Sequence, residues 1–330
     1  MKKQVSIQYL RVIATLIVVL GHAIIIYDNV NWRVFISNNE SQFLYYLKQY
    51  INIIQMPIFF VIAGYLFKLS INKFSSFISI FWNKFKRLIV PYIFISLCWL
   101  IPIRALIGYS NYFVDGKFDY LVIIKNFLGI DNGHLWFVYV LFTIFLIYYL
   151  ANKTKTVKIL FIISIFTNIL NRYMHNYFFS NLVLYYLFYF GLGYLLFEKM
   201  GKIKHGDNIL LLISSVFLST LLIFYIDNSI LSNTLSIITN LFFITFMYNY
   251  LSKFSQNKFV DFIDKNSLGI YLFHPPIMYV FFKYIPNIPP ICLVTINIVV
   301  SVGISLLIMY GMRKIKINFL IGESVIKSKK

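Results

Sequence analysis

Two residues in the first apolar segment could do chemistry, Arg11 and His22. They are eleven positions apart, so an α-helix places them within about 20° of one another on one face and about 16 Å apart along its axis. A neutral imidazole can act as a general base or as a transient nucleophile. Gly21 and Ala23 flank the histidine and allow a second helix or a substrate to approach closely. The alternative is structural: the arginine extends to the membrane surface and the histidine packs.

A second candidate site lies in the stretch NKFKRLIVPY, where Lys84, Lys86 and Arg87 precede an apolar run. Lys84 and Arg87 are three positions apart, so on an α-helix they share a face and could bind one polyanion. An arginine offers phosphate two parallel hydrogen bonds, whereas a lysine is a point charge. The pattern fits a phosphorylated cytoplasmic ligand. It also fits a cluster that only orients the chain in the membrane.

Three further residues are candidates for binding or support, His134, Trp136 and His274. The first two open the stretch HLWFVYVLF and could equally be anchors at the membrane interface. His274 precedes two prolines in SLGIYLFHPP, and the alternative is that it fills a gap in a broken helix. Lys48 and Arg104 are the other ionisable residues expected inside apolar spans, and no Asp or Glu is expected clearly within one. Proton pumps usually depend on such carboxylates, so their absence disfavours that class.

The elements that must position these residues are long apolar spans. The chain has 330 residues, of which 60% are hydrophobic and 12% are charged, against about 25% charged residues in soluble domains. We predict an all-α polytopic membrane protein with about ten transmembrane helices, both termini cytoplasmic, and one integral-membrane domain over residues 1–330 without an extra soluble domain. The predicted spans are 7–27, 44–67, 88–108, 134–150, 159–170, 182–197, 209–226, 232–251, 267–284 and 290–312.

The net charge of +19 is a topology signal. Most lysines and arginines fall in alternate connections, on the side of the N-terminus, whereas several acidic residues fall in the opposite loops. This distribution obeys the positive-inside rule, so we expect membrane lipid and no nucleic acid as a partner. Cys98 and Cys292 both fall in spans. They offer neither a disulfide framework nor a metal-ligand spacing, so no metal is expected.

Five motifs, in order along the chain, resemble those of acyltransferase family 3, the integral-membrane O-acyltransferases of bacterial envelope carbohydrates. They are the Arg11–His22 pair, Pro57 to Leu66, Lys84 to Arg87 followed by Pro91-Tyr92, His134 to Phe137, and Tyr271 to Pro275. The chain departs from the family pattern twice. Ala63 stands where serine is frequent, and Lys84 replaces an arginine, which removes one bidentate phosphate donor.

The resemblance implies an O-acetyltransferase of the bacterial cytoplasmic membrane. It would move an acyl group, usually acetyl, from cytoplasmic acyl-CoA to hydroxyls of a capsule, an exopolysaccharide or a lipid-linked precursor. Acyl-CoA would be a co-substrate, and no bound cofactor is implied. The expected roles are catalysis by His22, donor binding by Arg11, Lys84 and Arg87, and acceptor binding or support by His134, Trp136 and His274.

The alternative is an exporter or flippase of an exopolysaccharide or a lipid-linked sugar. Spans interrupted by proline and glycine favour a transporter, whereas the lack of an internal repeat and of buried carboxylates disfavours it.

Overall fold

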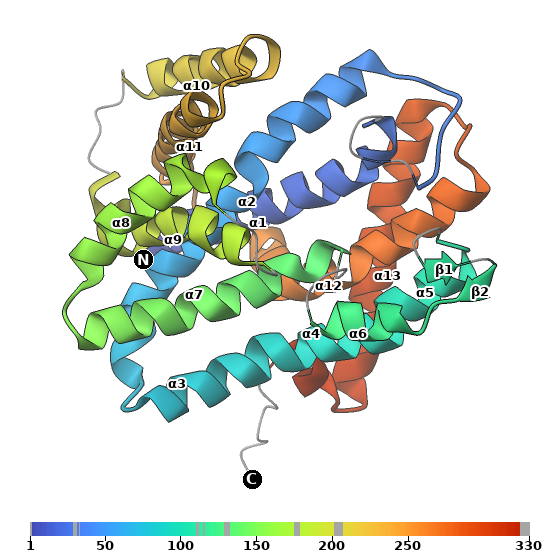
Figure 1. Ribbon diagram of the computed structural model, residues 1–330, viewed down its shortest axis with the longest axis horizontal. Coiled ribbons are helices and arrows are strands. Elements are labelled where there is room, and N and C mark those ends of the chain that lie inside the picture. The colour runs from blue at the N-terminus through green and yellow to red at the C-terminus, as the bar shows by residue number, and fades with distance from the viewer. Residues whose placement is uncertain are drawn as a thin grey trace. The chain divides into compact units, whose positions relative to one another are not determined.

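The computed structural model describes residues 2–28, 32, 34–109, 112–114, 116–128, 133–174, 179–200 and 207–323 (Figure 1). Its helices are α1 (Lys2–Ala23), α2 (Gln42–Ser70), α3 (Phe77–Lys84), α4 (Val90–Ile95), α5 (Ile101–Leu106), α6 (Leu121–Phe127), α7 (Trp136–Lys153), α8 (Val157–Ile169), α9 (Ser180–Met200), α10 (Asp207–Phe224), α11 (Ser229–Leu251), α12 (Lys258–Tyr284) and α13 (Pro290–Lys314). The strands β1 (Phe113–Val114) and β2 (Lys117–Phe118) form one short antiparallel hairpin. The predicted all-α class is confirmed.

Seven helices in the described part of the chain are long and apolar enough to cross a membrane. They correspond to seven of the ten predicted spans. The other three are also helices: α8 and α10 are shorter, and the N-terminal part of α12 carries charged side chains. The thirteen residues of α8 extend about 20 Å, less than the roughly 30 Å of a hydrocarbon core. The chain is a multi-pass membrane protein, and the count of ten spans and the cytoplasmic termini stay predictions.

The helical stretch from α3 to α5 contains two π-helical turns, Phe85–Ile89 and Ser96–Leu100. A proline follows each turn, Pro91 near the start of α4 and Pro102 near the start of α5. Proline lacks the N–H that would bond four residues back, and its ring crowds that carbonyl. A local π turn is one way for a membrane helix to accommodate this defect. The first turn contains Arg87, so the basic segment does not continue α3 with α-helical spacing.

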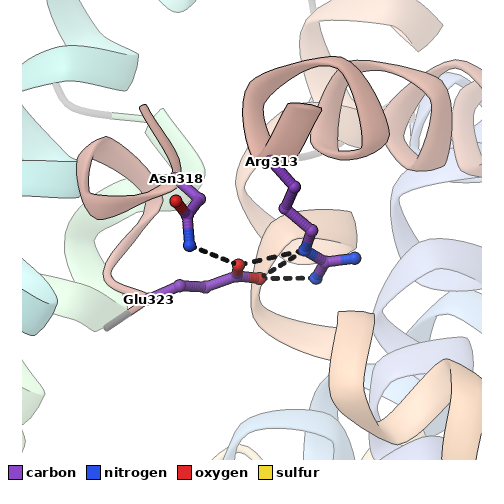
Figure 2. Close-up of polar contacts among 3 residues, drawn as sticks. All are labelled: Arg313, Asn318 and Glu323. Carbon is purple, nitrogen blue, oxygen red and sulfur yellow. Dashed lines mark hydrogen bonds and ion pairs between the residues drawn. The ribbon is translucent and has the colours of Figure 1, made fainter. Parts of the chain in front are cut away.

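The C-terminal segment packs against this basic turn. The 3-10 turn Asn318–Ile321 contacts α4 and the π turn Phe85–Ile89. Gly322 follows with φ +78°, and a Cβ there would collide with the carbonyl oxygen of Arg87, so this position requires glycine. Figure 2 shows the contact that closes the segment: Glu323 accepts hydrogen bonds from the guanidinium of Arg313 and from Asn318.

The chain falls into two compact units. The first comprises Met1–Ile17, Gln49–Ile80 and Thr143–Lys265, and the second comprises Val18–Lys48, Phe81–Phe142 and Asn266–Lys330. In the first unit α10 packs along α11 and α8 along α9, and α2 crosses α9 closely where Gly64 meets the backbone of Phe190 and Gly193 meets that of Val61. The prediction of one domain stays a prediction.

The second unit has an aromatic core around Arg104. The guanidinium carbon lies 4.4 Å from the ring centroid of Tyr109 and 5.4 Å from that of Tyr279, and the guanidinium donates a hydrogen bond to the Tyr112 hydroxyl. Arg104 is only 2% exposed. Cation–π contacts of this kind stabilise a buried guanidinium that has lost its hydration. This core anchors the C-terminal half of α12.

Candidate active site

Two consecutive prolines make α12 present carbonyl groups to histidines. Pro275 and Pro276 lie inside this helix. Because they lack N–H groups, the carbonyls four residues earlier, those of Tyr271 and Leu272, have no helical donor. Nε2 of His134 lies 3.1 Å from the Leu272 carbonyl oxygen. The His274 imidazole is hydrogen-bonded to the Tyr271 carbonyl and, through Nδ1 at 2.7 Å, to that of Ile270. The proline pair thus supplies acceptors for two imidazoles.

Three histidines meet in the second unit. Nδ1 of His22, near the end of α1, lies 2.9 Å from Nε2 of His274. The His134 ring centroid is 6.2 Å from that of His22 and 6.1 Å from that of His274. His274 is fully buried and His134 nearly so, whereas His22 is partly exposed. His22 is therefore the histidine of the three that a substrate can reach most directly.

Hydrogen bonds to neighbouring backbone fix the position of His134. Since a carbonyl oxygen only accepts, Nε2 of His134 carries the proton in its bond to Leu272. The Tyr271 hydroxyl also donates to the backbone carbonyl of His134. Nδ1 of His134 is buried and has no hydrogen-bond partner among the described residues. In the neutral ring this nitrogen is an acceptor, suited to a substrate hydroxyl.

A buried lysine interacts electrostatically with His22. Lys48 of α2 is 5% exposed, and its charge acts on the His22 imidazole. Asp28, just after α1, is 1% exposed and interacts electrostatically with the same lysine. An ammonium group next to a reacting imidazole can stabilise negative charge that develops on a substrate oxygen. The sequence predicts Lys48 inside a span but gives no signal of a role for it.

Arg11 takes part in a different contact, inside the first unit. Its Nε lies 2.6 Å from Oδ1 of Asp264, and its Nη2 donates to Oδ2 at 3.0 Å. Burial raises the pKa of the Asp264 carboxyl above its ordinary value, although the Arg11 charge acts in the opposite direction. The structure therefore pairs Arg11 with Asp264. Its guanidinium keeps further N–H groups for a second anion, and its donor-binding role stays a prediction.

Asp264 escaped the sequence analysis because α12 begins earlier than predicted. The helix starts at Lys258, whereas the predicted span starts at residue 267. Asn257 caps it, since its side-chain oxygen accepts from the backbone N–H groups of Phe259 and Val260. An asparagine before a helical segment is a recognised start signal, and this one would have placed Asp264 on the helix.

Comparison with known protein families decides the class of the molecule. The family model of the acyltransferase domain matches residues 4–310, nearly the whole chain and parts of both units. The chain belongs to acyltransferase family 3. It is therefore a membrane acyltransferase, as the five motifs indicated. No curated protein and no solved structure is significantly similar to it.

The remaining candidate residues of the acyltransferase lie on the stretch from α3 to the following π turn and at the start of α7. Lys84 ends α3 and is partly buried, whereas Arg87 is exposed in the following π turn. Their charges act on one another, although the π turn changes the α-helical angle expected between them. Trp136 is the first residue of α7, and its ring lies 6.3 Å from that of Phe137. Among the described residues, no group of three His, Cys, Asp or Glu side chains is arranged as a metal site.

Proposed function

We propose that the chain is an O-acyltransferase of the bacterial cytoplasmic membrane. It transfers an acyl group, foremost acetyl, from cytoplasmic acyl-CoA to a hydroxyl of a cell-envelope polysaccharide or its lipid-linked precursor. Family membership supports acyl transfer. The observation that carries the assignment of the reacting group is the partly exposed His22, which is hydrogen-bonded to buried His274 and lies near buried His134.

Direct transfer requires one base. Nε2 of His22 removes the proton of the acceptor hydroxyl, and the oxygen attacks the thioester carbonyl. The tetrahedral intermediate collapses with cleavage of the carbon–sulfur bond, and the imidazolium returns the proton to the departing thiolate of CoA. The products are an O-acyl ester and the free thiol. The Lys48 ammonium, whose charge acts on His22, would stabilise the oxyanion of the intermediate. An acyl-histidine intermediate would use the same nitrogen as nucleophile.

The donor and the acceptor are assigned to different residues. Lys84 and Arg87 supply two neighbouring positive charges for the phosphates of acyl-CoA. The unpartnered Nδ1 of His134 suits the acceptor hydroxyl, and Trp136 offers an aromatic face to a sugar ring. Acyl-CoA is consumed in the reaction and is not a resident cofactor.

The test is complementation of a deletion strain of the host bacterium with wild type, His22→Gln or Leu16→Ala. Leu16 lies on the same helix with a half-exposed apolar side chain and serves as the matched control. We expect wild type and Leu16→Ala to restore the acyl content of the surface polysaccharide, and His22→Gln to reduce the rate of acylation about 100-fold or more.

A second readout uses the purified protein in lipid nanodiscs. Acetyl-CoA and unacylated polysaccharide from the deletion strain are supplied, and release of the CoA thiol is followed. Full complementation by His22→Gln would contradict the assignment of His22. Loss of the polysaccharide itself from the deletion strain would favour the exporter.

A further inference from the structure

We propose that His274 is a positioning residue that fixes the tautomer of His22, so that Nε2 of His22 carries the lone pair that reacts. The proton arrangement follows from contacts within the second unit. Its use in acyl transfer rests on the proposed function.

The arrangement begins at two backbone carbonyls. Nδ1 of His274 lies 2.7 Å from the Ile270 carbonyl oxygen, and the ring is also hydrogen-bonded to the Tyr271 carbonyl. Because a carbonyl oxygen can only accept, Nδ1 must carry hydrogen. A neutral imidazole has a single N–H, so Nε2 of His274 is left as an acceptor.

The same reasoning applies to His22. Nε2 of His274 and Nδ1 of His22 are 2.9 Å apart, a hydrogen-bond distance at which one nitrogen must donate. Since Nε2 of His274 is the acceptor, Nδ1 of His22 is the donor. The neutral His22 ring then has its lone pair on Nε2, the nitrogen turned away from His274. The tautomer of a histidine is set in this way by the bond that its other nitrogen makes.

Burial separates the roles of the two rings. His274 is 0% exposed, so it acts through His22 and not on a substrate. Pro275 contributes by withholding a backbone donor from the Tyr271 carbonyl, which keeps that acceptor available to His274. The His22 ring is also hydrogen-bonded to the Val18 carbonyl one turn earlier, which can only accept. Without His274 this carbonyl alone remains, and part of the His22 population takes the proton on Nε2, which blocks the reacting lone pair.

Two substitutions separate positioning from packing. In His274→Gln, the amide oxygen can accept from His22 and the amide nitrogen can donate to Ile270, but the side chain cannot ionise. In His274→Phe, a ring remains and every polar atom is lost. We expect His274→Gln to retain kcat within about tenfold, and His274→Phe to lose about 100-fold to 10,000-fold in kcat with little change in KM for acetyl-CoA, as expected for a misplaced proton on a catalytic histidine.

A readout independent of activity is the nitrogen NMR spectrum of histidine-labelled protein in nanodiscs. The His22 signals are assigned by their loss in His22→Gln. We expect wild type and His274→Gln to show His22 protonated at Nδ1 and bare at Nε2, and His274→Phe to show Nε2 protonated in part of the His22 population, since the Val18 carbonyl remains as an acceptor.

Protonation of Nε2 in wild-type His22 overturns the proposal, as does an unchanged tautomer or an unchanged kcat in His274→Phe. If His274→Phe does not fold, the proposal is tested with wild type and His274→Gln. It then requires His22 to be protonated at Nδ1 in both spectra and the kcat of His274→Gln to stay within about tenfold of wild type. A wild-type spectrum with the expected tautomer but no acyl transfer would overturn the proposed function and leave the proton arrangement intact.

Discussion

At the scale of single residues, Lys84 and Arg87 differ in what they offer a phosphate. Arg87 is exposed and carries the planar guanidinium that can bind two phosphate oxygens at once, whereas Lys84 is partly buried and is a point charge. Their charges oppose one another, so neither stabilises the other in the absence of an anion. A polyanion bound at both side chains would relieve this repulsion.

Substitution of Arg87 should therefore weaken binding of the acyl donor more than it lowers the catalytic rate. In Arg87→Gln we expect KM for acetyl-CoA to rise about tenfold or more, because a hydrogen bond to a charged group contributes about 1.5–3 kcal/mol, with kcat nearly unchanged. Steady-state release of CoA thiol measures both constants. Lys86→Gln removes the same charge from the adjacent exposed position and should leave KM within about twofold. Equal effects of the two substitutions would show that Arg87 attracts acetyl-CoA only through its positive charge and not through a specific contact.

Sequence spacing identifies residues that belong to one helix but not their partners. Arg11 and His22 emerge from spacing because both lie on α1. Their contacts do not, since Asp264 is 253 positions from Arg11 and His274 is 252 positions from His22. The sequence alone is compatible with both a functional and a packing role of His274. The structure shows a fully buried ring that is hydrogen-bonded to His22, and this contact depends on tertiary packing that no local pattern encodes.

At the scale of elements, the proline pair of α12 determines which carbonyls the histidines can use. Pro276→Ala would restore an N–H opposite the Leu272 carbonyl, the acceptor of His134. We expect activity to fall while thermal stability is kept or raised, because alanine is the better helix former. Pro290→Ala is the control, since Pro290 is at the start of α13 where no intrahelical donor is needed. Unchanged activity in Pro276→Ala would show that this acceptor is dispensable.

The crossing of α2 and α9 depends on two glycines that face each other's backbone. A Cβ at Gly64 would collide with the Phe190 carbonyl oxygen, and a Cβ at Gly193 with that of Val61. Small residues at such a crossing let membrane helices pack through their backbones. In Gly193→Ala the helices must separate, which we expect to cost about 1–3 kcal/mol and to lower the thermal midpoint in detergent. Gly303→Ala, where a Cβ would meet no atom within 4 Å, should leave the midpoint unchanged.

The C-terminal clasp of Arg313, Asn318 and Glu323 predicts a dependence on pH. Burial disfavours ionisation of Glu323, but the hydrogen bonds and the charge of Arg313 outweigh this effect, so the pKa of Glu323 lies below its ordinary value of 4.5. A carboxyl whose pKa is lower in the folded state stabilises the fold above the unfolded-state pKa, and this stability is lost as pH falls through the folded-state pKa. Because the groups are partly exposed, the contribution is about 1 kcal/mol at most.

We therefore expect Glu323→Gln to lower the thermal midpoint slightly at neutral pH. The difference from wild type should shrink once the pH falls below 4.5 and the wild-type carboxyl takes up a proton. Comparing the two proteins at each pH cancels the titration of all other carboxyls. A difference that stays constant through this range would show that the charge of Glu323 does not support the clasp.

Apolar runs predict the positions of the helices more accurately than they predict the ends of the helices. All ten predicted spans coincide with helices in the structure. The π turns were not predicted, because they depend on how the segment before each proline relaxes. The early start of α12 was missed because hydropathy does not register a cap such as Asn257.

At the scale of the whole molecule, the number of membrane crossings determines on which side the C-terminal segment lies. Seven helices in the described residues qualify by length and composition, whereas the charge distribution favours ten crossings. The two counts agree that residue 36 is outside and residue 255 inside when the N-terminus is cytoplasmic. They disagree about the connections after α8 and after α9, the end of α12 and the segment after α13. With seven crossings, Arg313 and Lys314 would be carried to the outside, against the positive-inside rule.

Cysteine labelling distinguishes the two counts. Cys98 and Cys292 are first replaced by serine, and Ile36→Cys, Ser255→Cys, Tyr284→Cys or Ile315→Cys is introduced singly at exposed positions. An impermeant maleimide is then applied to whole cells. We expect labelling at residues 36 and 284 only, because ten crossings place the end of α12 outside and the basic segment after α13 inside. Labelling at residue 315 but not at residue 284 would instead support seven crossings and would move the Arg313–Glu323 clasp to the outer surface.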